Sequence, residues 1–366
     1  DGSYAFAFLF SRRIILGRDP VGLMPLYYGE DSETYAFASE RKALWSLGIQ
    51  NVKSFPPGNL AIIDNERMIF QSVRTIIKSD IKPISMENAA ERLQSLLTES
   101  VGERILDTKR VALAFSGGLD STVIASFAKK CDAEIQLIYV GMQEQPEIQH
   151  AETVAEFLDL PLQVKTFTPE DAEEVLSKVL WLIEEPDILK VSVAIPFYWI
   201  AEVANKVGLN VLLAGQGSDE LFGGYYRYLR EYASSGIKGL EDALYRDVVS
   251  SHDVNFERDN KVCAFHDVEL RLPFADYDLI RFSLGLPVKL KIASMKDHLR
   301  KRVLREVARR IKLPSTVYSM RKRAIQYTTR IDKVLGKLAK EGGLSLKDYI
   351  EQSFLKGKEI YNPKNA

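Results

Sequence analysis

The stretch Ala112-Leu-Ala-Phe-Ser-Gly-Gly-Leu-Asp-Ser-Thr122 decides how the rest of the chain is interpreted. Its first residues form a short apolar run, which is typical of a strand covered on both faces. Ser116, Gly117 and Gly118 follow, and glycines without Cβ atoms allow a tight turn whose N–H groups come close to a ligand. Residues 119–130 then have the apolar spacing of a helix. Backbone N–H groups in a turn that opens a helix predict an anion site.

Asp120, in the first turn of that helix, indicates which anion is bound. A carboxylate repels a bare phosphate, but it can share a divalent cation with phosphate oxygens. The common phosphate-loop and dinucleotide-binding patterns do not follow this strand. Ser116-Gly-Gly-Leu-Asp-Ser121 instead resembles the pyrophosphate loop of ATP pyrophosphatases, which split ATP into AMP and pyrophosphate. An ordinary glycine-rich turn is the alternative, but strand, Ser-Gly-Gly, acidic residue and helix occur in register.

Composition limits the class of protein. The chain has 366 residues, which predicts two or three domains, and its 46% hydrophobic and 27% charged residues are those of a globular protein. A net charge of −1 argues against nucleic acid as a partner. Cys131 and Cys263 are too few for a metal cluster or a disulfide scaffold, which favours a cytoplasmic location. We expect no membrane span, and we expect further residues upstream of Asp1.

Residues 1–80 predict an antiparallel α+β domain, because short apolar runs alternate with Gly and Asp turns. A short helix is expected at 40–47, and a helix capped by Ser85 follows a linker. These strands are too few to close a sandwich, so we expect half of one. The expected strands are 4–10, 13–16, 25–28, 34–38 and 60–63.

Residues 81–366 predict a second domain with a doubly wound parallel sheet. Strands at 110–115, 135–140, 162–167 and 210–214 alternate with helices at 119–130, 148–158, 170–183 and 194–207. Ligands of such sheets bind beyond the carboxyl ends of the strands, where Ser116, Gly141 and Gly215 fall. After residue 220 the chain is expected to be helical to its end.

A second glycine-rich segment, Ala214-Gly-Gln-Gly-Ser-Asp-Glu-Leu-Phe-Gly-Gly-Tyr-Tyr226, follows the last predicted strand. It could simply turn the chain. Alternatively, it forms a second wall of the nucleotide site, and Asp219 approaches Asp120 so that both bind one Mg²⁺ together with phosphate oxygens. The acidic residue among glycines favours the second interpretation.

The 214–226 segment resembles the Gly-Glu-Gly-x-Asp-Glu-x-Phe-Gly-Gly-Tyr motif of asparagine synthetases, and the resemblance extends across essentially the whole chain. Gly17-Arg-Asp-Pro-Val-Gly-Leu-Met-Pro-Leu-Tyr-Tyr28, residues 37–44 and Phe55-Pro-Pro-Gly58 resemble the second half of that family's glutamine amidotransferase domain. The family's glutaminase nucleophile, an N-terminal cysteine, belongs to the first half. No glutaminase residue is therefore assigned here.

This resemblance implies roles for several residues. Asp219 and Gln216 belong to the catalytic group, and Tyr225 contacts substrate. The family's usual residue at position 216 is glutamate, which helps to handle protons during acyl transfer. Glutamine cannot accept a proton at pH 7, so another group must do so. Ser116, Gly117, Gly118, Asp120, Ser121 and Gly215 are expected to bind ATP, whose adenine is expected beside Val140 and Gly141.

Two further segments carry the resemblance. Arg258-Asp-Asn-Lys261 and Val268-Glu-Leu-Arg-Leu-Pro-Phe-Ala-Asp276 resemble a family segment, which implies that Lys261, Glu269 and Arg271 bind an amino-acid substrate. A buried ion pair that holds helices together is the alternative for Glu269 and Arg271. The four histidines, His150, His252, His266 and His298, have no metal or triad spacing and are expected to be structural.

A basic helix is expected at 295–312. Most of its cations should be solvated, but Lys296-Asp-His-Leu-Arg300 resembles the family's Lys-His-x-Leu-Arg, which implies that Lys296 binds the nucleotide. Relatives also carry Arg-Pro-Lys near Arg321-Lys-Arg323, and their lysine stabilises charge in the reaction. Alignment on Gln326-Tyr327 assigns this catalytic role to Lys322, and a shift of one residue would assign it to Arg323.

The resemblance implies an ATP-dependent amide ligase, with ATP and Mg²⁺ as cofactors. Aspartate or a similar acid, and ammonia, are the implied small-molecule partners, and a homodimer is an expected form. Another amide-forming synthetase, such as a β-lactam synthetase, stays open because of Gln216. An RNA-modifying enzyme with the same pyrophosphate loop and a non-catalytic nucleotide-binding relative also stay open.

Overall fold

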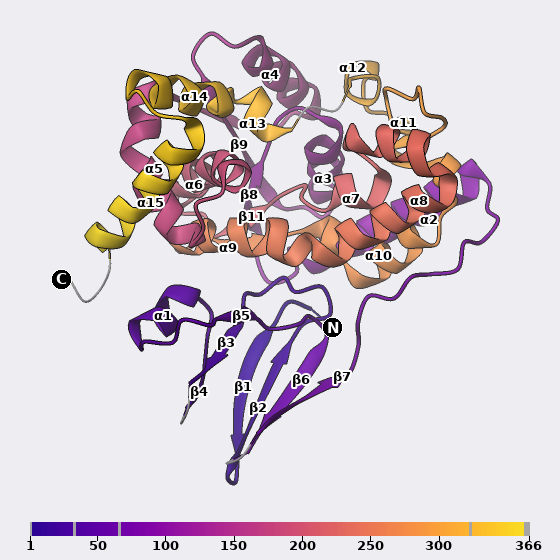
Figure 1. The fold of residues 1–366 in the computed structure, drawn as a ribbon. Helices are drawn as coiled ribbons and strands as arrows, with labels where there is room; N and C mark the ends of the chain where they lie inside the picture. The colour runs from indigo at the N-terminus through magenta and orange to yellow at the C-terminus, as the bar shows by residue number, and fades with distance from the viewer. Residues whose placement is uncertain (1, 32–33, 65–66, 322–323, 362–366) are drawn as a thin grey trace.

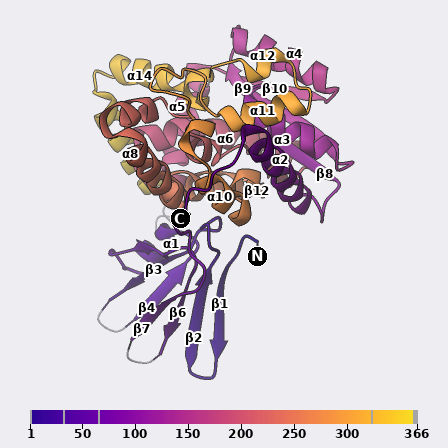
Figure 2. The ribbon, with the colours of Figure 1, turned by 90° about the vertical axis from the view of Figure 1, so that its right-hand side faces the viewer.

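A computed structural model describes residues 2–31, 34–64, 67–321 and 324–361. Antiparallel strands lie on one side of the molecule, and a parallel sheet surrounded by helices lies on the other (Figures 1 and 2). The boundary predicted near residue 80 falls in the segment between the last antiparallel strand and the first long helix.

The N-terminal part contains two antiparallel sheets. One has the order β1-β2-β6-β7, and the other has the order β4-β3-β5. Both contribute to one apolar cluster with Leu16, Leu26, Phe55 and Ile63, as expected for facing layers. Their elements are β1 (Ala5–Phe10), β2 (Arg13–Arg18), β3 (Tyr27–Glu30), β4 (Tyr35–Ala38), α1 (Arg41–Ser46), β5 (Lys53–Ser54), β6 (Asn59–Ile63) and β7 (Met68–Ser72).

The central parallel sheet has the order β10-β9-β8-β11-β12. Its strands are β8 (Arg110–Ala114), β9 (Glu134–Met142), β10 (Leu162–Phe167), β11 (Val211–Leu213) and β12 (Glu269–Arg271). The chain passes from β8 outward to β10 and returns to the other side of β8 with β11. The point where the strand order reverses, between β8 and β11, is where such sheets bind ligands. The predicted doubly wound sheet is confirmed.

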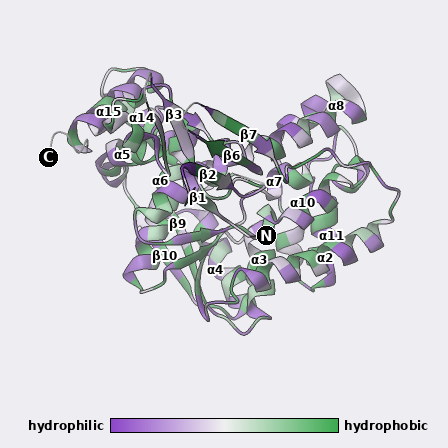
Figure 3. Cartoon of the chain, turned by 90° about the horizontal axis from the view of Figure 1, so that it is seen from below, coloured by the Kyte–Doolittle hydropathy of each residue, from purple (hydrophilic) through white to green (hydrophobic). Residues whose placement is uncertain are grey.

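Helices cover both faces of this sheet. α3 (Leu119–Lys129) and α4 (Pro146–Leu158) make the first two crossovers and contact β8, β9 and β10. α6 (Ile188–Lys206) packs on the strands too, with α5 (Pro169–Ile183) beside it. Ser85 accepts a hydrogen bond from Asn88 N at 3.1 Å and caps α2 (Met86–Glu103), as predicted. Figure 3 shows hydrophobic and hydrophilic residues on the same helices, as amphipathic packing requires.

Helix α6 is the one helix in the described ranges that is long and apolar enough to cross a membrane by length and composition. Its most apolar window is 72% buried inside the molecule. The helix contacts β8 to β11, α5 and α9 (Glu257–Ala264). Packing in the core therefore accounts for its apolar sequence.

The prediction that the chain is all-helical after residue 220 is wrong at β12. This strand pairs in parallel with β11, with Val211 opposite Glu269 and Leu213 opposite Arg271. The segment Val268-Glu-Leu-Arg-Leu272 does alternate apolar and charged residues, which is the period of a strand. Its three residues are too few to distinguish it by pattern from the surrounding helices.

The remaining chain is helical, with one difference from the prediction. The basic helix expected at 295–312 is shorter, because α11 begins only at Arg302 and Lys301 has a left-handed backbone with φ of 51°. The other elements are α7 (Ser218–Phe222), α8 (Arg227–Ser251), the π-helical turn η1 (His252–Phe256), η2 (Pro273–Ala275), α10 (Tyr277–Leu284), η3 (Val288–Leu290), α11 (Arg302–Arg310), α12 (Ser315–Tyr318), α13 (Ile325–Thr328), α14 (Ile331–Glu341) and α15 (Leu346–Tyr361).

Candidate active site

The two glycine-rich segments meet beyond the carboxyl ends of β8 and β11. These strands are neighbours, with Leu213 opposite Leu113, so the loops that follow them adjoin. A Cβ atom added to Gly215 would lie 3.0 Å from Cβ of Asp120. The sheet topology therefore brings together two segments that are almost 100 residues apart in the sequence. We predicted this because both segments follow the carboxyl ends of parallel strands.

Lys301 connects the two loops. Its ammonium nitrogen lies 2.9 Å from both carboxylate oxygens of Asp120 and 2.6 Å from Oδ1 of Asp219. Oγ of Ser218 is 3.2 Å from the same nitrogen and donates to Asp120 Oδ1 at 2.9 Å. The Lys301 side chain is 1% exposed and the two carboxylates are 12% and 13% exposed. One cation thus holds two carboxylates at a common point.

Gly224 leaves space for this cluster, and Arg305 holds the turn that carries Lys301. A Cβ atom on Gly224 would lie 1.8 Å from Asp219 Oδ1 and 2.3 Å from Cε of Lys301, so only glycine fits there. Arg305 donates from Nε to the carbonyl oxygen of Arg300 at 2.7 Å and also donates to the Leu299 carbonyl oxygen. These bonds hold the turn that directs Lys301 into the site.

The family implies Mg²⁺, and the donor set here agrees with it in part. Carboxylate oxygens from Asp120 and Asp219 converge, and Mg²⁺ prefers such oxygens together with those of substrate phosphates. In the described part of the chain, no group of three or more His, Cys, Asp or Glu side chains could hold a metal. The two carboxylates therefore fit an ion that arrives with nucleotide phosphates, rather than a site made by protein alone.

A cavity of about 640 Å³ opens above the cluster. Both apolar side chains and polar or charged side chains line it. The apolar group contains Phe115, Val140, Val193, Phe197 and Ile200. The polar group contains Gln216, Glu220, Arg227, Asn255 and Arg258. A cavity of this size with few convergent polar groups is typical of a small-molecule site.

Glu220 organises part of the polar group. It is 3% exposed and accepts hydrogen bonds from Tyr225 Oη at 2.6 Å and Asn255 Nδ2 at 2.8 Å. Burial, and then the charge of Asp219, raise the pKa of the Glu220 carboxyl. This buried acid fixes two side chains that face the cavity.

The structure brings many of the predicted site residues to this cavity. Its lining includes Ser116, Asp120, Ser121, Val140, Gly215, Gln216, Asp219 and Tyr225. Gly117 and Gly118 belong to the same loop, and Gly141 follows Val140 in β9. His150, expected to be structural, lies 3.0 Å from the Gly117 carbonyl oxygen through Nε2. Lys322 and Arg323 lie outside the described residues, and Ala324 and Ile325, which follow them, line the cavity.

Lys296 is exposed on the irregular segment before α11 and does not belong to the cavity lining. Lys301, which the sequence pattern groups with the solvated cations, is instead the lysine that pairs with Asp120 and Asp219, while Lys190 is a lysine in the cavity lining. The signal is present in the sequence, since Lys301-Arg-Val-Leu-Arg305 repeats the Lys-x-x-Leu-Arg spacing of 296–300 five residues later. The resemblance alone could not choose between the two copies.

Glu269 and Arg271, which were expected to bind substrate, lie outside the cavity lining and form an ion pair with each other. Arg271 donates to Glu269 at 2.8 and 2.9 Å, and also to Asp107, away from the cavity lining. Lys261 is also buried away from the lining. It pairs with Glu184 and lies 4.5 Å from the centre of the Tyr27 ring. Lys261 is buried between neighbouring elements, whereas Glu269 is exposed, so its pair with Arg271 lies at the surface.

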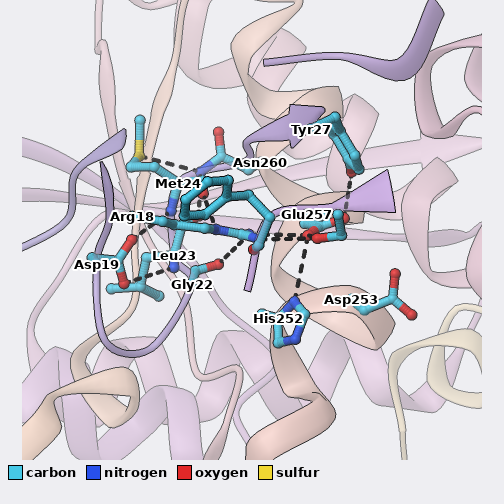
Figure 4. Close-up of polar contacts among 12 residues, drawn as sticks. Arg18, Asp19, Gly22, Leu23, Met24, Tyr27, His252, Asp253, Glu257 and Asn260 are labelled. Atoms are coloured by element: carbon cyan, nitrogen blue, oxygen red, sulfur yellow. Dashed lines mark hydrogen bonds and ion pairs between the residues drawn. The ribbon is translucent and has the colours of Figure 1, made fainter. Parts of the chain in front are cut away.

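The Gly17–Tyr28 motif forms the junction between the two parts of the molecule (Figure 4). Asp19 accepts hydrogen bonds from the backbone N–H groups of Val21, Leu23 and Met24 and holds the turn. Arg18 extends from this turn to Glu257 of α9 at 3.0 Å. Arg18 and Asp19 of this motif therefore have structural roles, in the contact with α9 and in the turn.

Glu257 is buried in this junction. Besides Arg18, it accepts hydrogen bonds from Tyr27 and from Ser54 Oγ at 2.7 Å, and His252 Nδ1 lies 3.4 Å away (Figure 4). Burial raises the pKa of the Glu257 carboxyl, but His252, Arg18 and the hydroxyl donors together outweigh burial and lower it. Glu257 therefore binds the N-terminal part as an ionised carboxylate.

The parallel sheet, the pyrophosphate-type loop at its switch point and the lysine-bridged carboxylates define a nucleotide-binding α/β protein. Comparison with known proteins gives the family. The asparagine synthase family model matches residues 92–239 and 231–357, and a glutamine amidotransferase domain model matches residues 1–46. The chain belongs to the asparagine synthase family, as the motifs predicted.

Relatives show the same match. The chain is 34% identical to a putative glutamine-hydrolyzing asparagine synthetase 1 of Methanocaldococcus jannaschii, over 95% of this chain and 72% of that protein. It is 26% identical to asparagine synthetase B of Escherichia coli and to asparagine synthetase of Rattus norvegicus, over 84% of this chain in both cases. The chain spans 57% and 59% of the lengths of those two proteins.

Proposed function

We propose that this chain uses ATP to convert a carboxylic acid, aspartate or a similar acid, and ammonia into an amide. The observation that carries the proposal is the convergence of Asp120, Asp219 and Lys301 at the Ser116–Ser121 loop, beside a cavity that both apolar and polar side chains line. This arrangement provides for triphosphate and for a small polar acid in one space. Names of the relatives support the same activity.

ATP would lie with its adenine against the apolar group of the lining, near Val140, and its phosphates near the 116–121 loop. Gly117 has a φ of +67°, which directs the loop backbone around the anion. The acid would lie beside Gln216 and Arg258. The α-phosphate and the carboxyl group would then meet near Gln216, between these two regions.

In the first step, an oxygen of the acid attacks the α-phosphorus of ATP. The new P–O bond forms as the bond to the bridging oxygen breaks, and pyrophosphate leaves with the electron pair. Lys301 and the N–H groups of Gly117 and Gly118 stabilise the charge that gathers on pyrophosphate. Asp120 and Asp219 would hold Mg²⁺, which when bound neutralises further negative charge on the phosphates.

In the second step, ammonia attacks the acyl carbon of the carboxyl-AMP anhydride. The C–N bond forms, the C–O bond to phosphate breaks, and AMP leaves with the electron pair while one proton passes to solvent. Gln216 cannot accept this proton but can orient the attacking nitrogen. The same cavity serves both steps.

Exchange of labelled pyrophosphate into ATP tests this function. The chain should catalyse exchange when aspartate or a similar acid is added, and ammonia should then produce AMP and the amide. Exchange that needs no acid, or none with any of a panel of acids, would contradict the proposal. The panel also tests the second candidate function, a synthetase that activates a different acid. Gln216 favours this candidate because the family's usual residue at this position is glutamate. A homodimer and a cytoplasmic location stay predictions.

A further inference from the structure

The Gln216 side chain has a fixed partner behind the cavity wall. Its Nε2 donates to Oδ2 of Asp259 at 2.5 Å. Gln216 lines the cavity, whereas Asp259, on α9, is fully buried and lies outside the lining. The amide nitrogen is therefore directed into the protein.

Asp259 can serve here only as an acceptor. Arg258 donates to it twice, from Nε to Oδ1 at 2.7 Å and from Nη2 to Oδ2 at 2.9 Å. Arg258 is 4% exposed, so this is a buried bidentate pair. Because a carboxylate with such a partner accepts hydrogen bonds, the atom of Gln216 that faces Asp259 must be the nitrogen.

The orientation of the Gln216 amide determines whether it offers a substrate a hydrogen-bond donor or an acceptor. The nitrogen and oxygen of an amide diverge from one carbon, so a nitrogen turned to the buried Asp259 directs the carbonyl oxygen away from it, in a residue that lines the cavity. In the described ranges, no donor from the protein reaches this oxygen. Gln216 therefore offers a substrate a hydrogen-bond acceptor.

We propose that Asp259 is a positioning residue that holds the Gln216 carbonyl oxygen toward the cavity, where it accepts an N–H of the nitrogen nucleophile. This inference rests on the proposed function, because it concerns the second step. An acceptor beside the acyl carbon binds ammonia through N–H and leaves its lone pair directed at carbon. The activation step makes no use of this contact.

Three variants of the whole chain test the proposal: Asp259→Asn, Gln216→Met and the double variant. Asparagine can donate as well as accept, so in Asp259→Asn the Gln216 amide can turn its nitrogen to the cavity. Each single variant should raise KM for ammonia about three- to tenfold and should lower amide formation more than it lowers acid-dependent pyrophosphate exchange. In the Gln216→Met background, Asp259→Asn should have no further effect on KM for ammonia.

Equal losses of exchange and amide formation in Asp259→Asn, or an effect of this change that persists in the Gln216→Met background, would overturn the proposal. Absence of exchange in the unmodified chain would instead contradict the proposed function. These two failures are therefore distinguishable.

A second measurement needs neither activity nor a folded Asp259 variant. In the unmodified chain, the side-chain amide protons of Gln216, assigned by their loss in Gln216→Met, should exchange with water more slowly than those of the exposed Gln50. This slow exchange is expected because one proton is bonded to a buried carboxylate. Exchange as fast as that of Gln50 would show that Asp259 does not hold the amide.

Discussion

Lys301 is the single residue on which the candidate site most depends, because its nitrogen joins Asp120 and Asp219. Lys301→Met should lower acid-dependent pyrophosphate exchange by about 10²- to 10³-fold, as loss of one preorganised charge donor does. The same change at exposed Lys296 should alter the rate by less than about twofold, within the usual range for surface residues. Exchange rates of the two purified variants provide the comparison. A larger loss at Lys296 would show that the 296–300 copy of the motif is the functional one.

A substitution at Gly224 tests how closely the two loops pack around Lys301. Gly224→Ala would force Cβ against Asp219 Oδ1 and Lys301 Cε, so we expect the exchange rate to fall by about tenfold or more. Gly336→Ala in α14 is the matched control, since a Cβ there meets no atom within 4 Å. The control should retain full activity. Equal activity of both variants would mean that the loops approach less closely than the structure shows.

The sequence predicted the site residues that directly follow strands of the sheet. It did not predict the site residues that come from distant helices. Asp120 and Asp219 each stand a few residues beyond a strand, so the sheet alone places them together. Lys301 and Asp259 come from helix ends far along the chain, and nothing in their local pattern states where they point. Gln216 was predicted from the motif, but its partner was visible only in three dimensions.

Among the secondary-structure elements, η1 and α9 connect the two parts of the molecule. His252 and Glu257 face the N-terminal part, while Asn255 and Arg258 line the cavity. Arg18→Met would leave Glu257 buried without its cation, so it should lower the free energy of unfolding by about 3–5 kcal/mol. Exposed Arg13→Met is the control and should change it by less than about 0.5 kcal/mol. Denaturant titration measures both, and similar values for the two variants would refute the role of the pair.

The same carboxylate predicts a pH dependence. The pKa of Glu257 is lower in the folded protein than the ordinary value of about 4.3, so the folded state binds fewer protons there than the unfolded state. The stability it contributes is present above pH about 4.3 and is lost as pH falls through the lowered folded value. Tm should therefore fall less steeply below that pH in Glu257→Gln than in the unmodified chain. Parallel curves would contradict the ionised state of Glu257.

Element prediction succeeded where a pattern was long. The alternation of strands and helices between 110 and 207 was predicted closely except at α6, which begins at Ile188 rather than at 194, because buried parallel strands and crossover helices each leave a distinct period. β12 has three residues, and the left-handed Lys301 interrupts a pattern that otherwise continues as a helix. Tertiary contacts account for each exception, because β12 pairs with β11 and Arg305 holds the turn before Arg302.

The whole molecule joins an antiparallel part, matched at its start by a glutamine amidotransferase domain model, to a synthetase part that contains the cavity. Both fold classes were predictable, because strand spacing and motif order run the length of the chain. The buried ion pairs at the junction were not, since Arg18 and Glu257 are separated by 239 residues. Only the folded chain shows that the amidotransferase-type motif at 17–28 contacts α9, the helix that contributes Arg258 to the cavity lining.

Formation of AMP by the unmodified chain tests the central claim most directly. The chain is incubated with ATP, Mg²⁺ and aspartate, with or without ammonia, and AMP and amide are both measured; a parallel reaction contains glutamine in place of ammonia. Our account predicts AMP and amide in equal amounts when both aspartate and ammonia are present. AMP formed without ammonia, or only with an acid unlike aspartate, would contradict the proposed reaction or its substrate.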